Sequence, residues 1–95
     1  MIRVRHEVTE EGHVLSLQGH ANNDERGKDT VCAAVSILYM TLRESTDGEN
    51  VSSGDYNYHE ITCERSEIND AAFDFAIRGL ELLAEEYPEN ICIEE

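Results

Sequence analysis

The chain has 95 residues, of which 29% are charged, and its formal net charge is −14 at pH 7. This length predicts one domain, residues 1–95, with a single small core. The negative charge excludes the usual nucleic-acid-binding proteins, because phosphates would be repelled and no cluster of Lys or Arg offsets the repulsion. Such a charge is typical of a solvated acidic surface, and it also suits a basic partner.

The sequence also argues against a membrane protein. It has no stretch of about 18 consecutive apolar residues to span a bilayer, and residues 1–6 lack the apolar segment of a signal peptide. The three cysteines, at positions 32, 63 and 92, are widely spaced and odd in number. Without an export signal, this pattern indicates free thiols in a reducing cytoplasm.

The chain begins with a predicted β-hairpin. Residues 2–8 largely alternate between apolar and charged types, which predicts a strand with one buried face. Residues 10–12 predict a turn and residues 13–20 the returning strand. Leu17 and His20 lie on opposite faces of that strand, so His20 need not enter the core. A surface position is the simplest interpretation of the histidines at 6, 13 and 59, and it is an alternative for His20 as well.

The first predicted helix follows a polar segment. Residues 21–28 contain no periodic apolar residue and predict a loop. Residues 30–45 predict a helix whose core stripe comprises Val31, Ala34, Val35, Leu38, Tyr39 and Leu42. Three more apolar residues lie on the opposite side of this helix, where either a second copy of the chain or a loop would cover them: Ala33, Ile37 and Met40.

The second half of the chain predicts a strand and a second helix. Residues 46–55 are rich in Gly, Ser and Asp and predict a loop. Residues 56–64 alternate weakly and predict a strand. The second helix is expected over residues 68–87, with Ser66 or Asn69 as its cap.

This second helix is apolar over a wide face, as expected for a helix wedged between a sheet and another helix. One stripe comprises Ile68, Ala72, Phe75, Ala76, Gly79 and Leu83, and an adjacent stripe comprises Phe73, Ile77, Leu80, Ala84 and Tyr87. Gly79 lowers helix propensity, so close approach of a neighbouring backbone is its simplest use. Pro88 ends the helix, and residues 91–93 predict a last short strand.

The predicted order is therefore β-β-α-β-α-β, and the first two strands are joined without a crossover. This order predicts an α+β fold of two layers, in which two helices pack on one face of a largely antiparallel four-stranded sheet.

The start of the first predicted helix carries the best candidate for a nucleophile. Asp29 can cap the helix by accepting a hydrogen bond from a first-turn amide, and Cys32 would then be the third helical residue. Free N–H groups and the helix dipole favour an anion there and lower the pKa of a thiol. His20 precedes Cys32 by twelve residues. If the intervening loop folds back, a thiol and an imidazole come together, the pair that a cysteine hydrolase needs.

Each of these residues also has a simpler interpretation. A cysteine beside two alanines is most often a small core residue, and Cys63 and Cys92 are interpreted as core residues of strands. Asp29 either only caps the helix or also orients the imidazole, as the third member of a triad does. Ser36 could hydrogen-bond the substrate or the thiol, although a serine in a helix is usually incidental, and Gly27 could bend the loop.

A metal site is the competing class of centre. The histidines and cysteines that could gather at one place are His13, His20, Cys32, His59 and Cys63. None of them has the close paired spacing of structural zinc ligands, so we predict neither a metal nor another cofactor.

Two motifs resemble those of a known family. Residues 19–21 read GHA and residues 27–36 read GKDTVCAAVS, and together they closely resemble the signature of the bacterial ribosomal-processing cysteine proteases, the Prp family. Residues 79–80 (GL) and 87–88 (YP) are similar to the family's second-helix and C-terminal pattern. The resemblance thus covers nearly the whole chain.

The resemblance implies a cytoplasmic, homodimeric endopeptidase that needs no cofactor. Cys32 would be the nucleophile, and His20 the general base and acid, of a Cys/His dyad. Members of the family remove a short N-terminal extension from a large-subunit ribosomal protein after an aromatic, apolar motif, and residues 21–28 would be a flexible lid that orders on the peptide. Thr30 stands where the family usually has an aliphatic residue, and residues 22–25 are more acidic than the family pattern.

The competing interpretation is a non-enzymatic ribosome-associated or assembly module. Its acidic surface would bind a basic partner, and Cys32 and His20 would be vestigial or structural. Selective alkylation of Cys32 near neutral pH, ahead of Cys63 and Cys92, would favour the protease.

Overall fold

The computed structural model describes residues 1–19, 28–47, 50–54 and 58–94. In chain order, these residues form β1 (Ile2–Val8), β2 (Gly12–Gln18), α1 (Lys28–Ser45), β3 (Asn50–Gly54), β4 (Tyr58–Glu64), α2 (Glu67–Glu86) and β5 (Ile91–Glu94).

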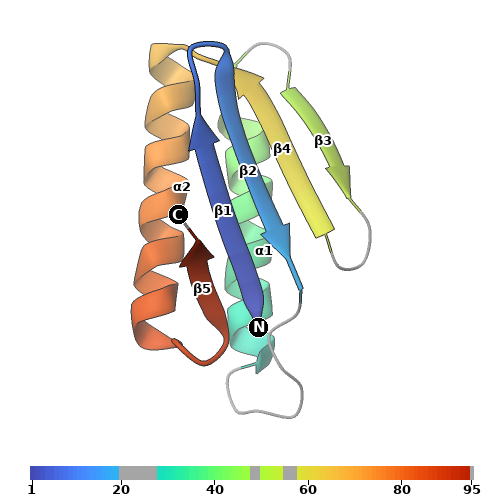
Figure 1. Cartoon of the computed structure of the whole chain (residues 1–95), viewed down its shortest axis with the longest axis vertical. Helices are drawn as coiled ribbons and strands as arrows, with labels where there is room; N and C mark the ends of the chain where they lie inside the picture. Colours follow the sequence, from blue (N-terminus) through green and yellow to red (C-terminus); the bar gives the residue numbers. More distant parts are fainter. Residues whose placement is uncertain (20–27, 48–49, 55–57, 95) are drawn as a thin grey trace.

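The strands form one sheet in the order β3-β4-β2-β1-β5, and both helices cover the same face of it (Figure 1). β2 pairs antiparallel with β1 and with β4, and β4 pairs antiparallel with β3. β5 lies parallel to β1, so the sheet is mixed rather than purely antiparallel. The parallel pair arises because α2 carries the chain back along the sheet before β5 begins. The predicted α+β class, with two helices on one face of a sheet, is confirmed.

β3 is an edge strand that the sequence pattern does not mark. The composition of residues 46–55 predicts a loop, yet residues 50–54 pair with β4. That prediction is wrong because the strand contains one apolar residue, Val51, and has no alternation. An edge strand is held by backbone hydrogen bonds to one neighbour, which leave no signature in the side chains. The other four strands and both helices occur in the predicted order.

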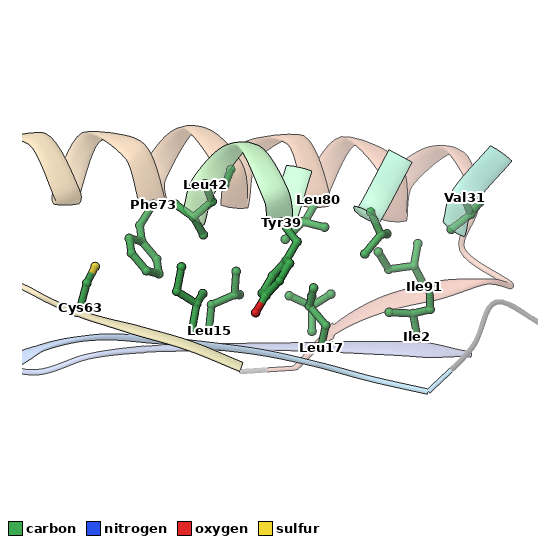
Figure 2. Packing of buried hydrophobic residues seen from close by; sticks show 14 residues of the cluster. Ile2, Leu15, Leu17, Val31, Tyr39, Leu42, Cys63, Phe73, Leu80 and Ile91 are labelled. Carbon is green, nitrogen blue, oxygen red and sulfur yellow. The ribbon is translucent and has the colours of Figure 1, made fainter. Parts of the chain in front are cut away.

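The core lies between the helix layer and the sheet, as Figure 2 shows. Alternate residues of the strands point toward the helices, and each helix turns one stripe toward the sheet. The sheet contributes Ile2, Val4, Leu15, Leu17, Ile61, Cys63 and Ile91, and the helices contribute Val31, Val35, Tyr39, Leu42, Phe73, Ala76 and Leu80. Burying a side chain of the size of Leu or Phe stabilises the fold by about 1.5–3 kcal/mol. This gain sets the rotation of each helix about its own axis.

The exposed apolar residues of α2 correct the prediction for its core face. Ile68 and Phe75 belong to a predicted core stripe, yet they are 54% and 81% exposed. The buried residues of α2 form a narrower stripe: Asn69, Phe73, Ala76 and Leu80. α2 contacts α1 on one flank and the sheet on another. The apolar side of α2 that contacts neither stays in solvent.

Gly79 lies where α2 approaches α1. A Cβ atom added there would come within 2.9 Å of Leu38 Cδ2, so the missing side chain lets the two helices pack closely. The close approach predicted for this glycine is present, but the neighbour is the end of a flexible side chain and not a backbone.

Asn69 is a polar residue that is only 1% exposed, and its side chain joins three parts of the fold. Its amide nitrogen donates to the backbone carbonyl oxygens of Glu64 and Asp47 at 2.9 and 3.0 Å, and its amide oxygen accepts from the Asp47 N–H at 2.7 Å. The backbone N–H of Asn69 donates to Ser66 Oγ at 3.0 Å, which identifies Ser66 as the cap of α2. Asn69 therefore fastens the first turn of α2 to the end of β4 and to the segment after α1.

We expect Asn69→Ala to lower the free energy of unfolding by about 2–4 kcal/mol, because it removes three hydrogen bonds made by a buried side chain. Ser66→Ala removes one capping hydrogen bond and should lower it by about 1 kcal/mol. Urea denaturation followed by circular dichroism measures both changes. Glu67→Gln, at an exposed position in the same turn, is the matched control and should stay within about 0.5 kcal/mol of wild type. An Asn69→Ala protein of wild-type stability would contradict the bridging role.

Candidate active site

The predicted nucleophile, Cys32, lies near the start of α1. It is the fifth residue of the helix and directly follows Val31, which is fully buried. One residue corresponds to about 100° around a helix, so Cys32 lies at the edge of the core stripe. Its thiol is free and half-buried, and it packs against the core. Ser36, one turn further along α1, is exposed.

The helix begins earlier than its apolar periodicity predicts. We expect a start at residue 30 with Asp29 as the cap, but α1 begins at Lys28, so Asp29 is the second residue of the helix and Cys32 the fifth rather than the third. This difference arises because Lys28 and Asp29 are polar and carry no periodic signal. The N–H groups at the start of a helix have no partner within it. Cys32 lies about one turn into α1, near the positive end of the helix dipole, where an anion is favoured.

His20 and Gly27 lie outside the described residues, and so does the side chain of Asp29. The pairing of Cys32 with His20 therefore stays a prediction, as does the lid expected over residues 21–28. The residue before His20 is described: Gly19 has a φ of 96°, and a Cβ atom there would collide with the carbonyl oxygen of Met1. Only glycine adopts this conformation without strain, so Gly19 sets the path of the chain immediately before His20.

The three cysteines differ in their surroundings. Cys63 is buried, and both its burial and the negative charge of Asp70 raise the pKa of its thiol, so its predicted core position is confirmed. Cys92 is half-buried and is paired with Arg3, which is exposed. Cross-strand partners share a face, so Cys92 lies on the side of the sheet away from the helices, and its predicted core position is wrong.

Among the residues that the structure describes, no three His, Cys, Asp or Glu side chains are grouped so that they could hold a metal ion. Neither helix, within the same described ranges, is long and apolar enough to cross a membrane.

A second polar group lies where α2 begins, and the sequence pattern only hinted at it. His13 is 3% exposed; its Nε2 lies 2.6 Å from Asp70 Oδ1, and its Nδ1 lies 3.1 Å from His6 Nε2. The surface position predicted for His13 is therefore wrong. The available signal was the strand alternation, because His6 is in phase with Val4 and His13 with Leu15, which are both core residues.

A family model described as cysteine protease Prp matches residues 1–92 of the chain. The chain is similar to the essential ribosomal processing protease Prp from S. aureus with a covalently linked product peptide, with 23% identity, a TM-score of 0.85 and coverage of 99% of this chain and 98% of that one. The same protease with a substrate peptide gives 25% identity, a TM-score of 0.78 and coverage of 99% and 98%. SMU.848 from Streptococcus mutans shares 28% identity with this chain, with a TM-score of 0.84 and coverage of 99% of this chain and 92% of that one. No curated protein matches the chain significantly.

The surroundings of the thiols predict an order of reactivity. We expect iodoacetamide near neutral pH to alkylate Cys32 first, because it is half-buried and near a helix N-terminus, and Cys92 more slowly, because it lies in a strand. Cys63 should stay unmodified until the protein unfolds, since its thiol is buried and its pKa is raised. Peptide mass spectrometry measures the three rates, and urea-denatured protein, in which all three thiols react, is the control. Equal rates in the folded protein would contradict this order.

Proposed function

This chain belongs to the cysteine protease Prp family and is a cysteine-type endopeptidase, and we propose that it removes the N-terminal extension of a large-subunit ribosomal protein in the cytoplasm. The family match over residues 1–92 carries the proposal. The S. aureus relative is a ribosomal processing protease that holds a substrate peptide in one structure and a covalently linked product peptide in another, which supports a peptide substrate for this chain.

In the proposed site, Cys32 is the nucleophile and His20 is the general base and acid. Two features support this assignment. Cys32 is half-buried and packs against the edge of the core. The end of β2, which leads to His20, and the start of α1 lie at the same end of the molecule (Figures 1 and 2). Asp29, Ser36 and Gly27 are supporting residues in this proposal.

The reaction needs the two side chains and water, without a cofactor. His20 takes the proton from Cys32 Sγ, and the thiolate attacks the carbonyl carbon of the scissile peptide bond. The C–N bond breaks as the imidazolium returns the proton to the leaving amine, which leaves a thioester on Cys32. Water then loses a proton to His20 and attacks the thioester, releasing the carboxylate product and the thiol. The unpaired N–H groups at the start of α1 suit a developing oxyanion.

The acidic surface supports a basic substrate, and ribosomal proteins are generally basic. The chain carries a net charge of −14. α2 has one basic residue, Arg78, against six acidic residues: Glu67, Asp70, Asp74, Glu81, Glu85 and Glu86. Opposite charge raises the association rate, and added salt reduces this effect.

The proposed homodimer would form through the outer face of the helix layer. Ile37 and Met40 of α1 are 58% and 47% exposed. On α2, three exposed apolar residues recur every seven positions and so share one side of the helix: Ile68, Phe75 and Leu82. An apolar groove between the helices includes Ile37 and Phe75 in its lining. Residues 30–42 contain no charged side chain, so this face of α1 can meet its copy without bringing like charges together.

We expect Cys32→Ala and His20→Ala each to reduce cleavage of the host's ribosomal protein by about 10³-fold or more, because each removes a group that makes or breaks a bond. The assay is incubation of the pure protein with that ribosomal protein, followed by measurement of its mass. Cys92→Ala is the matched control and should retain activity. Circular dichroism should show that all three variants are folded.

Full activity in Cys32→Ala would refute the dyad. A wild-type protein that binds the ribosomal protein without shortening it would favour the assembly module instead.

We expect Ile37→Glu to convert the dimer to a monomer, because it places a charge on the outer face of the helix layer without changing the core. Sedimentation velocity measures the change. Val8→Glu is the matched control, since Val8 is also an exposed apolar residue, at 48%, but lies on β1. A wild-type protein that sediments as a monomer at tens of micromolar, roughly the range in which a standard interface assembles, would refute this contact.

A further inference from the structure

Arg65, Asp70, His13 and His6 form a linked group, here called the histidine cluster, where the β1–β2 hairpin meets the start of α2. Arg65 Nε and Nη2 donate to Asp70 Oδ1 and Oδ2 at 2.8 and 3.0 Å. His13 Nε2 lies 2.6 Å from Asp70 Oδ1, and His13 Nδ1 lies 3.1 Å from His6 Nε2. The start of α2 and the start of α1 lie at opposite ends of the molecule (Figure 1), so the cluster is far from Cys32.

The hydrogen positions in the cluster follow from Asp70. Hydrogen bonds from Arg65 and His13 hold the pKa of the Asp70 carboxyl well below its usual range, so this group is an acceptor at neutral and mildly acidic pH. His13 Nε2 must therefore carry the hydrogen that it donates to Asp70. The atom of His13 that remains to interact with His6 is Nδ1.

Two nitrogen atoms 3.1 Å apart can share one hydrogen but cannot each carry one toward the other. When both imidazoles are neutral, His6 Nε2 donates to His13 Nδ1. One extra proton is accepted on either ring, because the remaining neutral nitrogen still serves as the acceptor. A second extra proton would direct N–H against N–H and bring two positive charges together. The pair therefore holds at most one positive charge while this contact is intact.

Packing restrains the two rings unequally. The His6 and His13 rings are within 4° of parallel, with centroids 5.4 Å apart. Both rings stack on Phe73 of α2, with centroids 5.6 and 4.4 Å from its ring. His13 and Phe73 are buried, so rotation of the His13 imidazole would displace core side chains, which dense packing resists. His6 is half-buried, and a second proton is accommodated only when its ring leaves His13 and Phe73, which opens the contact between the hairpin and α2.

The charges around His6 act in opposite directions. Burial and the neighbouring His13 lower the pKa of His6, whereas Asp74 on α2 raises it, and the lowering is the larger effect. Asp70 on α2, Arg65 between β4 and α2, and Cys63 on β4 are further ionisable groups at the cluster. Asp70 and Arg65 neutralise each other, and the raised pKa of Cys63 keeps that thiol uncharged.

We propose that the histidine cluster is an acid-sensitive latch that fastens the start of α2 to the β1–β2 hairpin. In the closed form, the hydrogen-bonded chain runs from Arg65 through Asp70 and His13 to His6 and joins α2 to two strands. In an opened form, the two rings no longer face each other, so each can accept a proton on acidification. The closed form accepts at most one, so acidification favours opening. The stabilisation is complete above about pH 7 and is lost as the pH falls.

The test compares the urea midpoints of wild type and His6→Gln at pH 7.5 and pH 5.5. Glutamine keeps an N–H donor for His13 Nδ1 but does not titrate. We expect the wild-type midpoint to fall between the two pH values and the His6→Gln midpoint to fall less. His59→Gln is the matched control, because it removes one imidazole that packs against Tyr39 on another part of the sheet. Its urea midpoint should fall by as much as that of wild type.

Opening has a local readout as well. Cys63 is buried on β4 and lines a pocket of about 330 Å³ together with His13. The measurement uses a disulfide reagent that reacts at acidic pH, such as 2,2′-dithiodipyridine, and compares the rate at Cys63 with the rate at Cys92. In wild type this ratio should be higher at pH 5.5 than at pH 7.5. In His6→Gln the increase should be smaller.

A His6→Gln midpoint that falls as steeply as wild type would overturn the proposal. If His6→Gln does not fold, imidazole ¹⁵N titration of wild type decides: uptake of one shared proton by His6 and His13 between pH 8 and 5 supports the latch, and two independent protonations in that range overturn it. These measurements do not use substrate cleavage, so their outcome is independent of the proposed proteolysis.

Discussion

The one-sided burial of the sheet is the constraint on which the rest of the molecule depends. Alternate side chains of β1, β2 and β4 point toward the helices, so α1 must turn Val31 toward the sheet. That rotation places the neighbouring Cys32 at the edge of the buried stripe, where the residue packs against the core and stays half-exposed. At the other end of the sheet, the same alternation directs His6 and His13 beneath α2 and against Phe73. The candidate nucleophile at one end and the two histidines at the other are thus both positioned by packing.

Those parts of the fold that depend on periodicity could be predicted from the sequence. Strand alternation and helical spacing locate both helices and four strands. β3 escaped prediction because backbone pairing at an edge needs no apolar pattern, and the parallel direction of β5 depends on where α2 ends rather than on residues 91–94. Phe75 shows the converse failure: helical spacing identifies an apolar residue, but it does not show how much of the helix its neighbours cover.

The candidate site was predictable to the extent that its signals are local. Cys32 stands where a polar segment meets an apolar stripe, and its place at the edge of that stripe follows from counting residues. The helix start was misplaced because Lys28 and Asp29 contribute nothing to periodicity. His13 could not be identified as a buried, hydrogen-bonded residue, since its partner Asp70 is 57 residues away in the chain. Buried polar groups find partners through the fold, and a pattern within one strand does not reveal them.

The parallel pairing of β5 with β1 also bears on how the chain is made. β5 emerges from the ribosome after every other element, and until then the outer edge of β1 presents unpaired backbone N–H and C=O groups to other nascent strands. Ile2 and Ile91 are register partners from distant parts of the sequence, so closing this edge is a late, entropically costly step in folding. If β1 and β2 pair before β5 is made, this edge of β1 is open to other strands, and a chaperone would protect the chain most in that interval.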